Sequence, residues 1–316
     1  MIKAIALCGP TASGKTRLSL EIAKRLSCEI ISSDSMQIYT GMDIGTAKAT
    51  KSERLEVRHH LIDFLSPSES YSTECYRRDA LAAAHDIVSR GKIPLFVGGT
   101  GLYIDTLLRA EQSNVPESDT EFRDKILKEL KTQEDIHALW ERLRECDPVS
   151  AEKIHENNVR RVIRAIEIYE KCGIPKSRLD ELSRERAKDI DILVIALDFH
   201  ERENLYARID ARVDVMMKEG LLDEVKSLYD AGLLSGANTA SQAIGYKELV
   251  SYLRGKSELS DSLELIKQSS RRYAKRQLTW FRHVDAVPLF VDTAEGEIKQ
   301  PDELLTEALK IINNHF

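Results

Sequence analysis

Short apolar runs alternate with longer segments of helical periodicity at both ends of the chain. The apolar runs, each of strand length, occupy residues 2–7, 29–33, 61–64, 93–97, 192–199 and 288–291. Apolar residues recur at helical spacing in segments 17–26, 72–89, 202–219 and 301–313. Strands that alternate with helices in this way predict an α/β fold around a parallel sheet.

The segment from residue 118 to about residue 189 breaks this alternation. It is rich in Glu, Lys and Arg, and its pattern predicts helices only. A polar stretch at residues 112–119 marks its beginning, and the apolar run at 192–199 marks the return to the sheet. We therefore predict a core domain of residues 1–112 and 190–316, with an all-helical insertion domain of residues 113–189.

Composition narrows the class of protein. The 316 residues are 42% apolar and 31% charged, as in ordinary globular proteins, and the net charge of −6 argues against an unspecific binder of nucleic acid. The five cysteines form no C-x-x-C motif, so neither a disulfide framework nor a zinc site is indicated. With no signal peptide and no apolar run of membrane-spanning length, we expect a cytoplasmic protein without membrane association.

Residues 9–16 match the phosphate-binding loop pattern G-x-x-x-x-G-K-[ST], between a predicted strand and a predicted helix. They are Gly9, Pro10, Thr11, Ala12, Ser13, Gly14, Lys15 and Thr16. In such a loop, backbone N–H groups and the helix N-terminus bind phosphate oxygens, Lys15 adds a positive charge, and Thr16 offers a hydroxyl to Mg²⁺. The core is therefore expected to be a P-loop NTPase-like parallel sheet. The loop alone leaves open whether a phosphoryl group is transferred or a whole diphosphate is displaced.

Two further turns follow predicted strands and should share an edge of the sheet with this loop. Asp34 to Gln37 follows the second strand, and Gly98 to Gly101 follows the strand at 93–97. Ligands of parallel α/β sheets bind at the carboxyl ends of the strands. Asp34 is therefore a candidate for the site, with a helix N-cap as the alternative role.

Two other segments are candidates of lower specificity. The irregular loop 41–48 contains two glycines and a lysine and could cover a bound phosphate. His59 and His60 would point to opposite faces of a strand, which makes them a poor metal pair, so we expect one packed histidine and one hydrogen-bonded histidine.

Positive charge is concentrated in three places. Arg160, Arg161 and Arg164 lie on one predicted helix of the insertion, where they could bind a phosphate backbone or only face solvent. Arg208 and Arg212 are spaced i, i+4 and could meet a diphosphate or pair with neighbouring acids. The segment 266–284 contains six Lys and Arg residues and no acid; its aromatic residues make it a candidate RNA-binding helix, with a solvated charged face as the alternative.

Taken together, the motifs resemble those of the bacterial tRNA dimethylallyltransferases from the first strand to about residue 282. They are GPTASGKT at 9–16, DSMQIY at 34–39, MDIGTAK at 42–48, HHLID at 59–63, VGGTGLY at 97–103, NNVRRVIRAIE at 157–167, AIGYKE at 243–248 and AKRQLTWFR at 274–282. One departure is Asn158, where the family often has Asp. From the lack of a C-x-x-C motif we expect no zinc-finger tail of the kind that eukaryotic relatives carry.

The resemblance implies an activity and a set of roles. The family transfers a dimethylallyl group from dimethylallyl diphosphate to N6 of the adenosine immediately 3′ of the anticodon, with Mg²⁺ and with release of diphosphate. Asp34 would act as the general base and Thr100 would hold the same amine, while Arg208 or Arg212 would stabilise the diphosphate. The implied contacts with the tRNA anticodon stem-loop are Asp34, Ser35, Met36, Gln37, Thr100, Arg123, Arg160, Arg161, Val162, Ile163, Arg164, Arg271 and Lys275.

Three other functions compete with this interpretation. A nucleoside or metabolite kinase would use the same loop, with Asp198 as a candidate Walker B acid. An adenylate isopentenyltransferase would prenylate a free nucleotide, and a nucleotide-gated RNA-binding switch would catalyse nothing. The insertion and the basic segment favour a macromolecular acceptor, and we expect the enzyme to work as a monomer.

Overall fold

The computed structural model describes residues 1–110, 119–182, 185–234 and 238–316. It divides into two compact units, a core of residues 1–107 and 189–316 and a helical unit of residues 108–188. Most of the polar stretch at 112–119, where the sequence predicts the first linker, lies outside the described residues.

Six parallel strands form the sheet of the core, which confirms the predicted α/β class. The strands are β1 (Ile2–Cys8), β2 (Cys28–Ser32), β3 (His59–His60), β4 (Ile93–Gly98), β5 (Ile190–Asp198) and β6 (Val287–Phe290), in the order β3-β2-β4-β1-β5-β6. The central strand β1 pairs Leu7 with Val97 on one side and with Ile195 on the other. Residues that follow β1, β2 and β4 therefore emerge close together at one edge.

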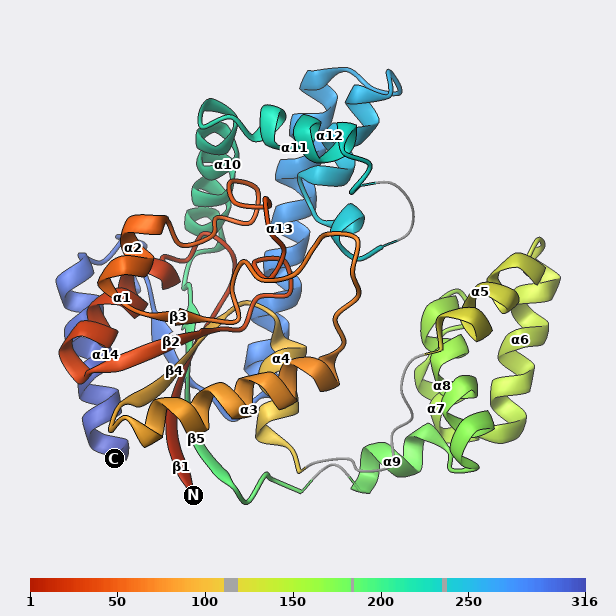
Figure 1. The fold of residues 1–316 in the computed structure, drawn as a ribbon, viewed down its shortest axis with the longest axis horizontal. Helices are drawn as coiled ribbons and strands as arrows, with labels where there is room; N and C mark the ends of the chain where they lie inside the picture. The colour runs from red at the N-terminus through yellow and green to blue at the C-terminus, as the bar shows by residue number, and fades with distance from the viewer. Residues whose placement is uncertain (111–118, 183–184, 235–237) are drawn as a thin grey trace. The chain divides into compact units, whose positions relative to one another are not determined.

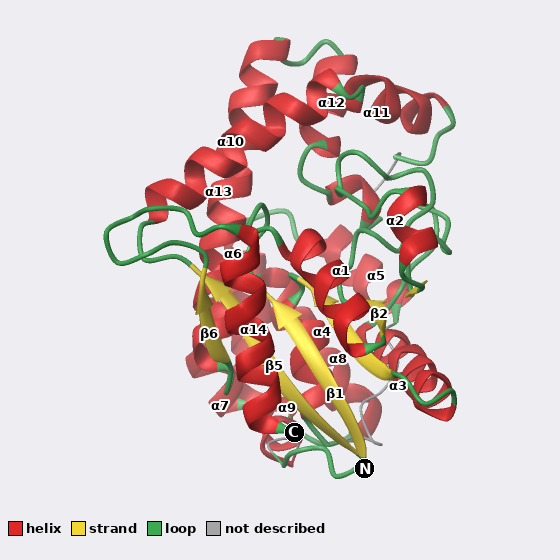
Figure 2. Cartoon of the chain, turned by 90° about the vertical axis from the view of Figure 1, so that its left-hand side faces the viewer, coloured by secondary structure: helices red, strands yellow, loops and turns green. Residues whose placement is uncertain are grey.

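Helices cover the sheet and extend beyond the carboxyl ends of its strands (Figure 1). The helices of the core are α1 (Lys15–Leu26), α2 (Lys51–Glu56), α3 (Thr73–Ser89), α4 (Gly101–Leu108), α10 (Arg202–Lys218), α11 (Leu221–Asp230), η1 (Ala240–Gln242), α12 (Tyr246–Leu253), α13 (Leu259–His283) and α14 (Pro301–His315). Figure 2 shows α1 and α14 side by side on one face of the sheet. Helices α11 and α12 lie past the ends of the strands, where a ligand would bind, and α13 runs from there back to the sheet.

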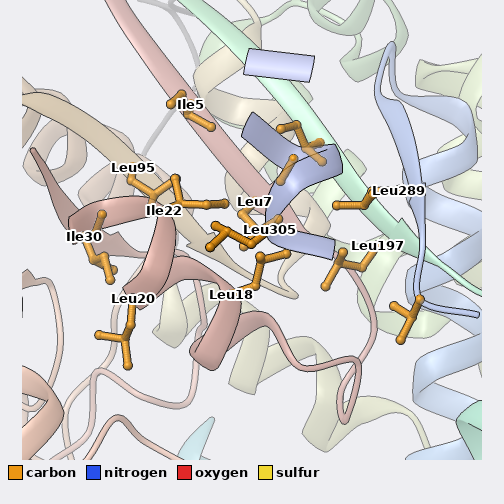
Figure 3. Packing of buried hydrophobic residues seen from close by; sticks show 14 of the residues in the cluster. Ile5, Leu7, Leu18, Leu20, Ile22, Ile30, Leu95, Leu197, Leu289 and Leu305 are labelled. Atoms are coloured by element: carbon orange, nitrogen blue, oxygen red, sulfur yellow. The ribbon is translucent and has the colours of Figure 1, made fainter. Parts of the chain in front are cut away.

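A large apolar cluster joins α1 and α14 to the sheet. Leu7 of β1, Leu18 of α1 and Leu305 of α14 all belong to it and are grouped together in Figure 3. Deleting a buried side chain of this kind costs about 2–5 kcal/mol of stability. The cluster therefore anchors the phosphate loop, which connects β1 to α1.

A second apolar cluster joins helices α10 to α13 to the segment that follows β2. Ile38, Tyr39 and Met42 pack there with Leu249 of α12 and Ile266 of α13. This cluster holds the loop 41–48 against the helices.

The helical unit contains helices only among its described residues, apart from one isolated bridge between Arg109 and Arg186. Its helices are α5 (Thr120–Glu129), α6 (Gln133–Cys146), α7 (Pro148–Lys153), α8 (Val159–Cys172) and α9 (Lys176–Leu182). Leu143 of α6 and Ile166 of α8 lie in its own apolar core.

Two details differ from the prediction. The short strand β3 lies at His59–His60 rather than at residues 61–64, because Leu61 and Asp63 have positive φ angles of 54° and 59° that end the strand. Helices α2, α4 and α11 were not predicted. No helix among the described residues is long and apolar enough to cross a membrane.

Candidate active site

The phosphate loop leaves β1 through a glycine that the packing requires. Gly9 has a φ of 147°, and a Cβ atom there would lie 2.8 Å from Leu197 Cβ. Gly14, with a φ of 93°, is the N-cap of α1. Glycine adopts such backbone angles without strain, so the loop is shaped by its own sequence and by the neighbouring strand.

Lys15 lies inside the loop rather than extending from it. Its Nζ donates to the carbonyl oxygens of Gly9 at 3.0 Å and of Pro10 at 2.6 Å. Burial, helped by the charge of Arg212, lowers the pKa of Lys15 to about 8, although Asp34 acts in the opposite direction. A buried cation of this kind gains strongly from an anionic ligand.

Arg208 and Arg212 of α10 face the phosphate loop, as their i, i+4 spacing allows. Arg208 Nε donates to the Ala12 carbonyl oxygen at 2.8 Å, and both arginines line the pocket described below. Burial lowers the pKa of each, and for Arg212 the carboxylate of Asp34 opposes this effect. The alternative pairing with the acids of α10 does not occur, because Asp210 and Asp214 pair with α13 instead.

One pocket of about 1040 Å³ joins the phosphate loop to the two other predicted turns. Its lining includes Thr11 to Thr16, Asp34 to Gln37, Gly98, Gly99, Arg208, Arg212, Tyr273 and Gln277. The three turns therefore meet at one edge of the sheet, as the sequence predicts. The pocket is polar where phosphate would lie and has the size of a small-molecule site.

Asp34 begins a tight turn and caps no helix. Its Oδ1 accepts from Met36 N at 2.9 Å, and the residues after it form turns, which excludes the alternative role as an N-cap. Ser33, just before it, is held by a 2.6 Å hydrogen bond to the Tyr76 hydroxyl. A Cβ at Gly98 would lie 2.1 Å from Ser33 O, so only glycine allows this close approach.

Thr100 lies beside the Asp34 turn. Its Oγ1 accepts from Ser35 N at 3.0 Å and donates to Ser35 Oγ at 3.3 Å, while Thr100 N donates to Ser33 O at 3.2 Å. The Thr100 hydroxyl is thus fixed against the turn that begins at Asp34, at the ends of two neighbouring strands.

The side-chain amide of Gln37 is already engaged by the protein. Its Nε2 donates to the carbonyl oxygens of Thr46 at 3.2 Å and of Ala47 at 3.4 Å, and its Oε1 accepts from Ser32 Oγ at 3.3 Å. The prediction that Gln37 contacts RNA stays a prediction, but the structure fixes which end of the amide faces the loop.

Helix α13 contributes two pocket residues: Gln277, which the sequence did not single out, and Tyr273, which was expected only as an aromatic residue of the RNA-binding segment. Gln277 Oε1 accepts from Thr11 N at 3.0 Å, and its Nε2 donates to Gly99 O at 2.8 Å, so it bridges two of the three turns. Tyr273, one helical turn earlier, hydrogen-bonds to Thr100 and Gln277; burial and the nearby Asp34 raise the pKa of its hydroxyl to about 12. The only sequence signal was the glycine at position 99, where a Cβ would lie 2.2 Å from Gln277 Nε2.

The basic face of α13 is partly neutralised. Lys267 pairs with Asp214, Arg271 with Asp210, and Arg282 with Asp198. The remaining cations, Arg272, Lys275 and Arg276, are exposed and form no ion pair within the part of the chain that the structure describes. The acids that segment 266–284 lacks are thus supplied by α10 and β5, and the prediction that Arg271 and Lys275 contact RNA stays a prediction.

Asp198 is unsuited to the role of a Walker B acid. Arg282 donates to both of its carboxylate oxygens at 3.0 Å. Asp198 is also absent from the lining of the phosphate pocket. The kinase alternative loses its candidate metal ligand.

The predicted RNA contacts of the helical unit fall into two groups. Arg160 and Arg161 are exposed on α8, whereas Arg123 and Arg164 pair with the buried Glu167. The side chains of Val162 and Ile163 are each 1% exposed within the apolar core of this unit. The prediction of RNA contact is therefore corrected for these two side chains, which helical periodicity turns inward.

No group of three or more His, Cys, Asp or Glu residues that could hold a metal ion occurs in the described ranges. His60 Nε2 lies 2.7 Å from Glu29 Oε2, and His59 Nδ1 lies 2.7 Å from Val57 O. Both histidines are thus hydrogen-bonded, to separate partners, whereas the sequence predicted one packed and one hydrogen-bonded histidine. Any metal here would depend on the Thr16 hydroxyl, which lines the pocket, and on ligand oxygens.

Comparison with known proteins gives consistent results. The family model described as IPP transferase matches residues 37–284, and a model described as isopentenyl transferase matches residues 2–66. The tRNA dimethylallyltransferase of Caldanaerobacter subterraneus is 44% identical over 92% of this chain and 91% of its own length. The enzyme of the same name from Bacillus velezensis is 46% identical over 96% of each chain.

Solved structures agree with these relatives. The tRNA isopentenylpyrophosphate transferase of Staphylococcus epidermidis is 40% identical and covers all of both chains with a TM-score of 0.70. A eukaryotic dimethylallyltransferase described as acting on tRNA is 34% identical, with a TM-score of 0.78 over 92% of this chain and 74% of its own.

Proposed function

The chain belongs to the IPP transferase family, and from this premise we propose that it transfers a dimethylallyl group from dimethylallyl diphosphate to N6 of the adenosine immediately 3′ of the anticodon in tRNA. The observation that carries the proposal is a pocket in which a phosphate loop with two arginines faces Asp34, whose turn is hydrogen-bonded to Thr100. One group of residues suits a departing diphosphate, and the other suits a nucleophilic amine.

The diphosphate leaves as the bond between its oxygen and the allylic carbon breaks. The negative charge that develops on that oxygen needs donors already in place, because preorganised charges stabilise a transition state most effectively. Lys15, Arg208 and Arg212 lie close to the phosphate loop and are partly or largely buried, so they can supply this charge. Each must give up little hydration when the ligand binds.

The N6 amine forms the new carbon–nitrogen bond and loses a proton. Asp34, a carboxylate at the pocket wall, accepts that proton, and Thr100 holds the amine from the other side. Because the amine of a stacked base is inaccessible, the adenosine must leave its stack to enter the pocket.

Mg²⁺ fits the phosphate side of the pocket. The Thr16 hydroxyl would hold it together with diphosphate oxygens and water, an arrangement that Mg²⁺ accepts readily. When bound, the ion would neutralise charge on the leaving group. Ser13 Oγ, buried in the same loop without a hydrogen-bond partner, is consistent with a loop shaped for a ligand.

RNA binding would use exposed cations on both units. Arg272, Lys275 and Arg276 on α13 and Arg160 and Arg161 on α8 are exposed, as contacts with a phosphate backbone require. Arg123 and Arg164 would contribute after rearrangement of their pairs with Glu167. A macromolecular acceptor is favoured over free adenylate by this distribution, and a cytoplasmic monomer is the expected form.

The test is turnover with purified protein. Incubation with dimethylallyl diphosphate, Mg²⁺ and unmodified tRNA should add one dimethylallyl group to the RNA, as mass spectrometry of the digested nucleosides would show. Prenylation of free AMP with no reaction on tRNA would favour the adenylate transferase. RNA of unchanged mass, together with phosphate transfer from ATP to a small acceptor, would overturn the proposal in favour of a kinase.

A further inference from the structure

The loop 41–48 contains three consecutive backbone N–H groups that point at one anion. The carboxylate of Glu224, on α11, accepts from Asp43 N at 2.9 Å, from Ile44 N at 2.8 Å and from Gly45 N at 3.1 Å. Successive amides in this arrangement form an anion-binding nest. These three amides are therefore engaged by a side chain of the protein, and the expectation that the loop covers a bound phosphate stays a prediction.

Tyr246, from the AIGYKE segment, completes the arrangement. Its hydroxyl donates to Glu224 Oε1 at 2.6 Å, and burial together with the Glu224 charge raises its pKa, so the hydroxyl stays protonated. A Cβ at Gly45 would lie 2.5 Å from the Tyr246 ring. Two segments that are far apart in the chain thus meet on one carboxylate, which accepts four hydrogen bonds.

The loop also contacts the acceptor side of the pocket. Gly45, Thr46 and Ala47 line the pocket themselves, and the carbonyl oxygens of Thr46 and Ala47 accept from the Gln37 amide. Gln37 belongs to the same turn as Asp34. The position of the loop therefore decides how Gln37 is held.

We propose that Glu224 is a positioning residue, whose carboxylate fixes loop 41–48 and through it the Gln37 side chain on the RNA-facing side of the pocket. The effect of Glu224 on catalysis rests on the proposed function. The structural link, by which Glu224 holds loop 41–48 and the loop holds Gln37, does not. A negative charge is needed because only a carboxylate can accept from three amides and a phenol at once; the neutral amide of Gln has a single acceptor oxygen.

The structural link is tested by hydrogen exchange on the full-length protein. In Glu224→Ala, the amides of Asp43, Ile44 and Gly45 should exchange at least about tenfold faster, since each loses a charge-assisted hydrogen bond. Asp223→Ala removes an exposed acid from the same helix and should leave these rates unchanged. Unchanged exchange in folded Glu224→Ala would overturn the proposal, whatever the activity of the protein.

The catalytic consequence is tested by a double-mutant cycle. Glu224→Ala should lower kcat/KM for tRNA about tenfold and change KM for dimethylallyl diphosphate by less than about twofold. In a Gln37→Ala background, Glu224→Ala should lower kcat/KM for tRNA by less than about twofold, because Glu224 acts through Gln37. An equal loss in both backgrounds would overturn the positioning role and leave only a contribution to folding.

Two further variants keep the test decisive if Glu224→Ala does not fold. Glu224→Gln keeps the shape, and Tyr246→Phe removes one donor, so each should accelerate exchange of the same three amides by less than Glu224→Ala is expected to do. Wild-type exchange in both would overturn the proposal. If the wild-type protein fails to prenylate tRNA, the proposed function fails while the exchange results still decide the structural link.

Discussion

The two walls of the pocket are built in different ways. On the phosphate wall, residues 9–16 with Arg208 and Arg212, the contacts of Lys15 reach back only six residues or fewer along the chain. On the acceptor wall, which comprises residues 34–37 and 98–100, the contacts join residues 65 and 178 positions apart. Lys15 is thus held by its own loop, and two long-range contacts, Arg208 with Ala12 and Gln277 with Thr11, add to the phosphate wall. The acceptor wall depends on long-range contacts throughout.

Because of this difference, the two walls should respond differently to substitutions. A loop that presents backbone groups to its ligand depends on glycine geometry and on a few charges, so its side chains act directly on the ligand. A wall made of long-range hydrogen bonds also depends on residues that never touch a substrate. We therefore expect substitutions on the two walls to affect donor and acceptor separately, with effects that decrease from the phosphate wall outward.

The largest effect is expected for Lys15→Ala. Removing the buried cation should lower the transfer rate by roughly a thousandfold, at the upper end of what one electrostatic donor contributes, and should raise KM for dimethylallyl diphosphate. Steady-state kinetics with varied donor would measure both. Lys24→Ala, on the exposed side of the same helix α1, should change neither value by more than about twofold, and a similar loss in both variants would contradict the assignment.

The pH dependence of donor binding provides a second test of the phosphate wall. The pKa of Lys15 is lowered to about 8, so its positive charge is fully present below that pH and is lost as the pH rises through it. Donor affinity of the free enzyme should therefore fall above about pH 8, and bound diphosphate should raise the pKa. Calorimetric titrations between neutral and alkaline pH would show this loss, and flat affinity across that range would count against the prediction.

Asp34→Ala should slow transfer to the acceptor without weakening the binding of the donor to the phosphate wall. Loss of a general base typically lowers the rate by about a hundredfold or more, while tRNA affinity and donor KM should stay nearly unchanged. Single-turnover kinetics with saturating substrates would isolate the chemical step. Unchanged turnover would remove Asp34 from the mechanism.

The same contrast explains how much could be predicted from the sequence. The strands of the sheet, the phosphate loop and the three turns at its edge follow from periodicity and from short motifs, because each depends on neighbours in the chain. The strand β3 was misplaced by two residues, because the positive φ angles of Leu61 and Asp63 leave little trace in composition.

The roles of Gln277, Tyr273 and Glu224 could not be predicted in this way. Each acts through a partner more than a hundred residues distant along the chain, such as Thr11 for Gln277 and Ile44 for Glu224. The ion pairs of α13 could not be predicted for the same reason, since Asp198 and Asp210 lie on other elements. Glycines with no room for a Cβ, as at positions 45 and 99, are the one local sign of such contacts.

A moderate effect is expected for Gln277→Leu, which cuts the connection between the two walls. The substitution leaves Thr11 N and Gly99 O without their partner, and an unsatisfied buried group costs about 1–3 kcal/mol. We expect kcat/KM to fall about tenfold for both substrates, because both turns shift. Gln268→Leu, exposed on the same helix α13, is the matched control. Equal kinetics for the two variants would show that the bridge has no catalytic role.

The smallest effect distinguishes paired from unpaired cations on α13. Lys275 is exposed and makes no ion pair in the described ranges, so Lys275→Ala should weaken tRNA binding and reduce the slope of log affinity against log salt by about one. Arg271 already pairs with Asp210, and replacing both by Ala keeps the net charge, so this double variant should preserve the slope. Filter binding over a range of salt concentrations would measure the slopes. A slope reduced equally in the two variants would mean that Arg271 leaves Asp210 to bind phosphate, and the acceptor wall would then extend further along α13 than its contacts indicate.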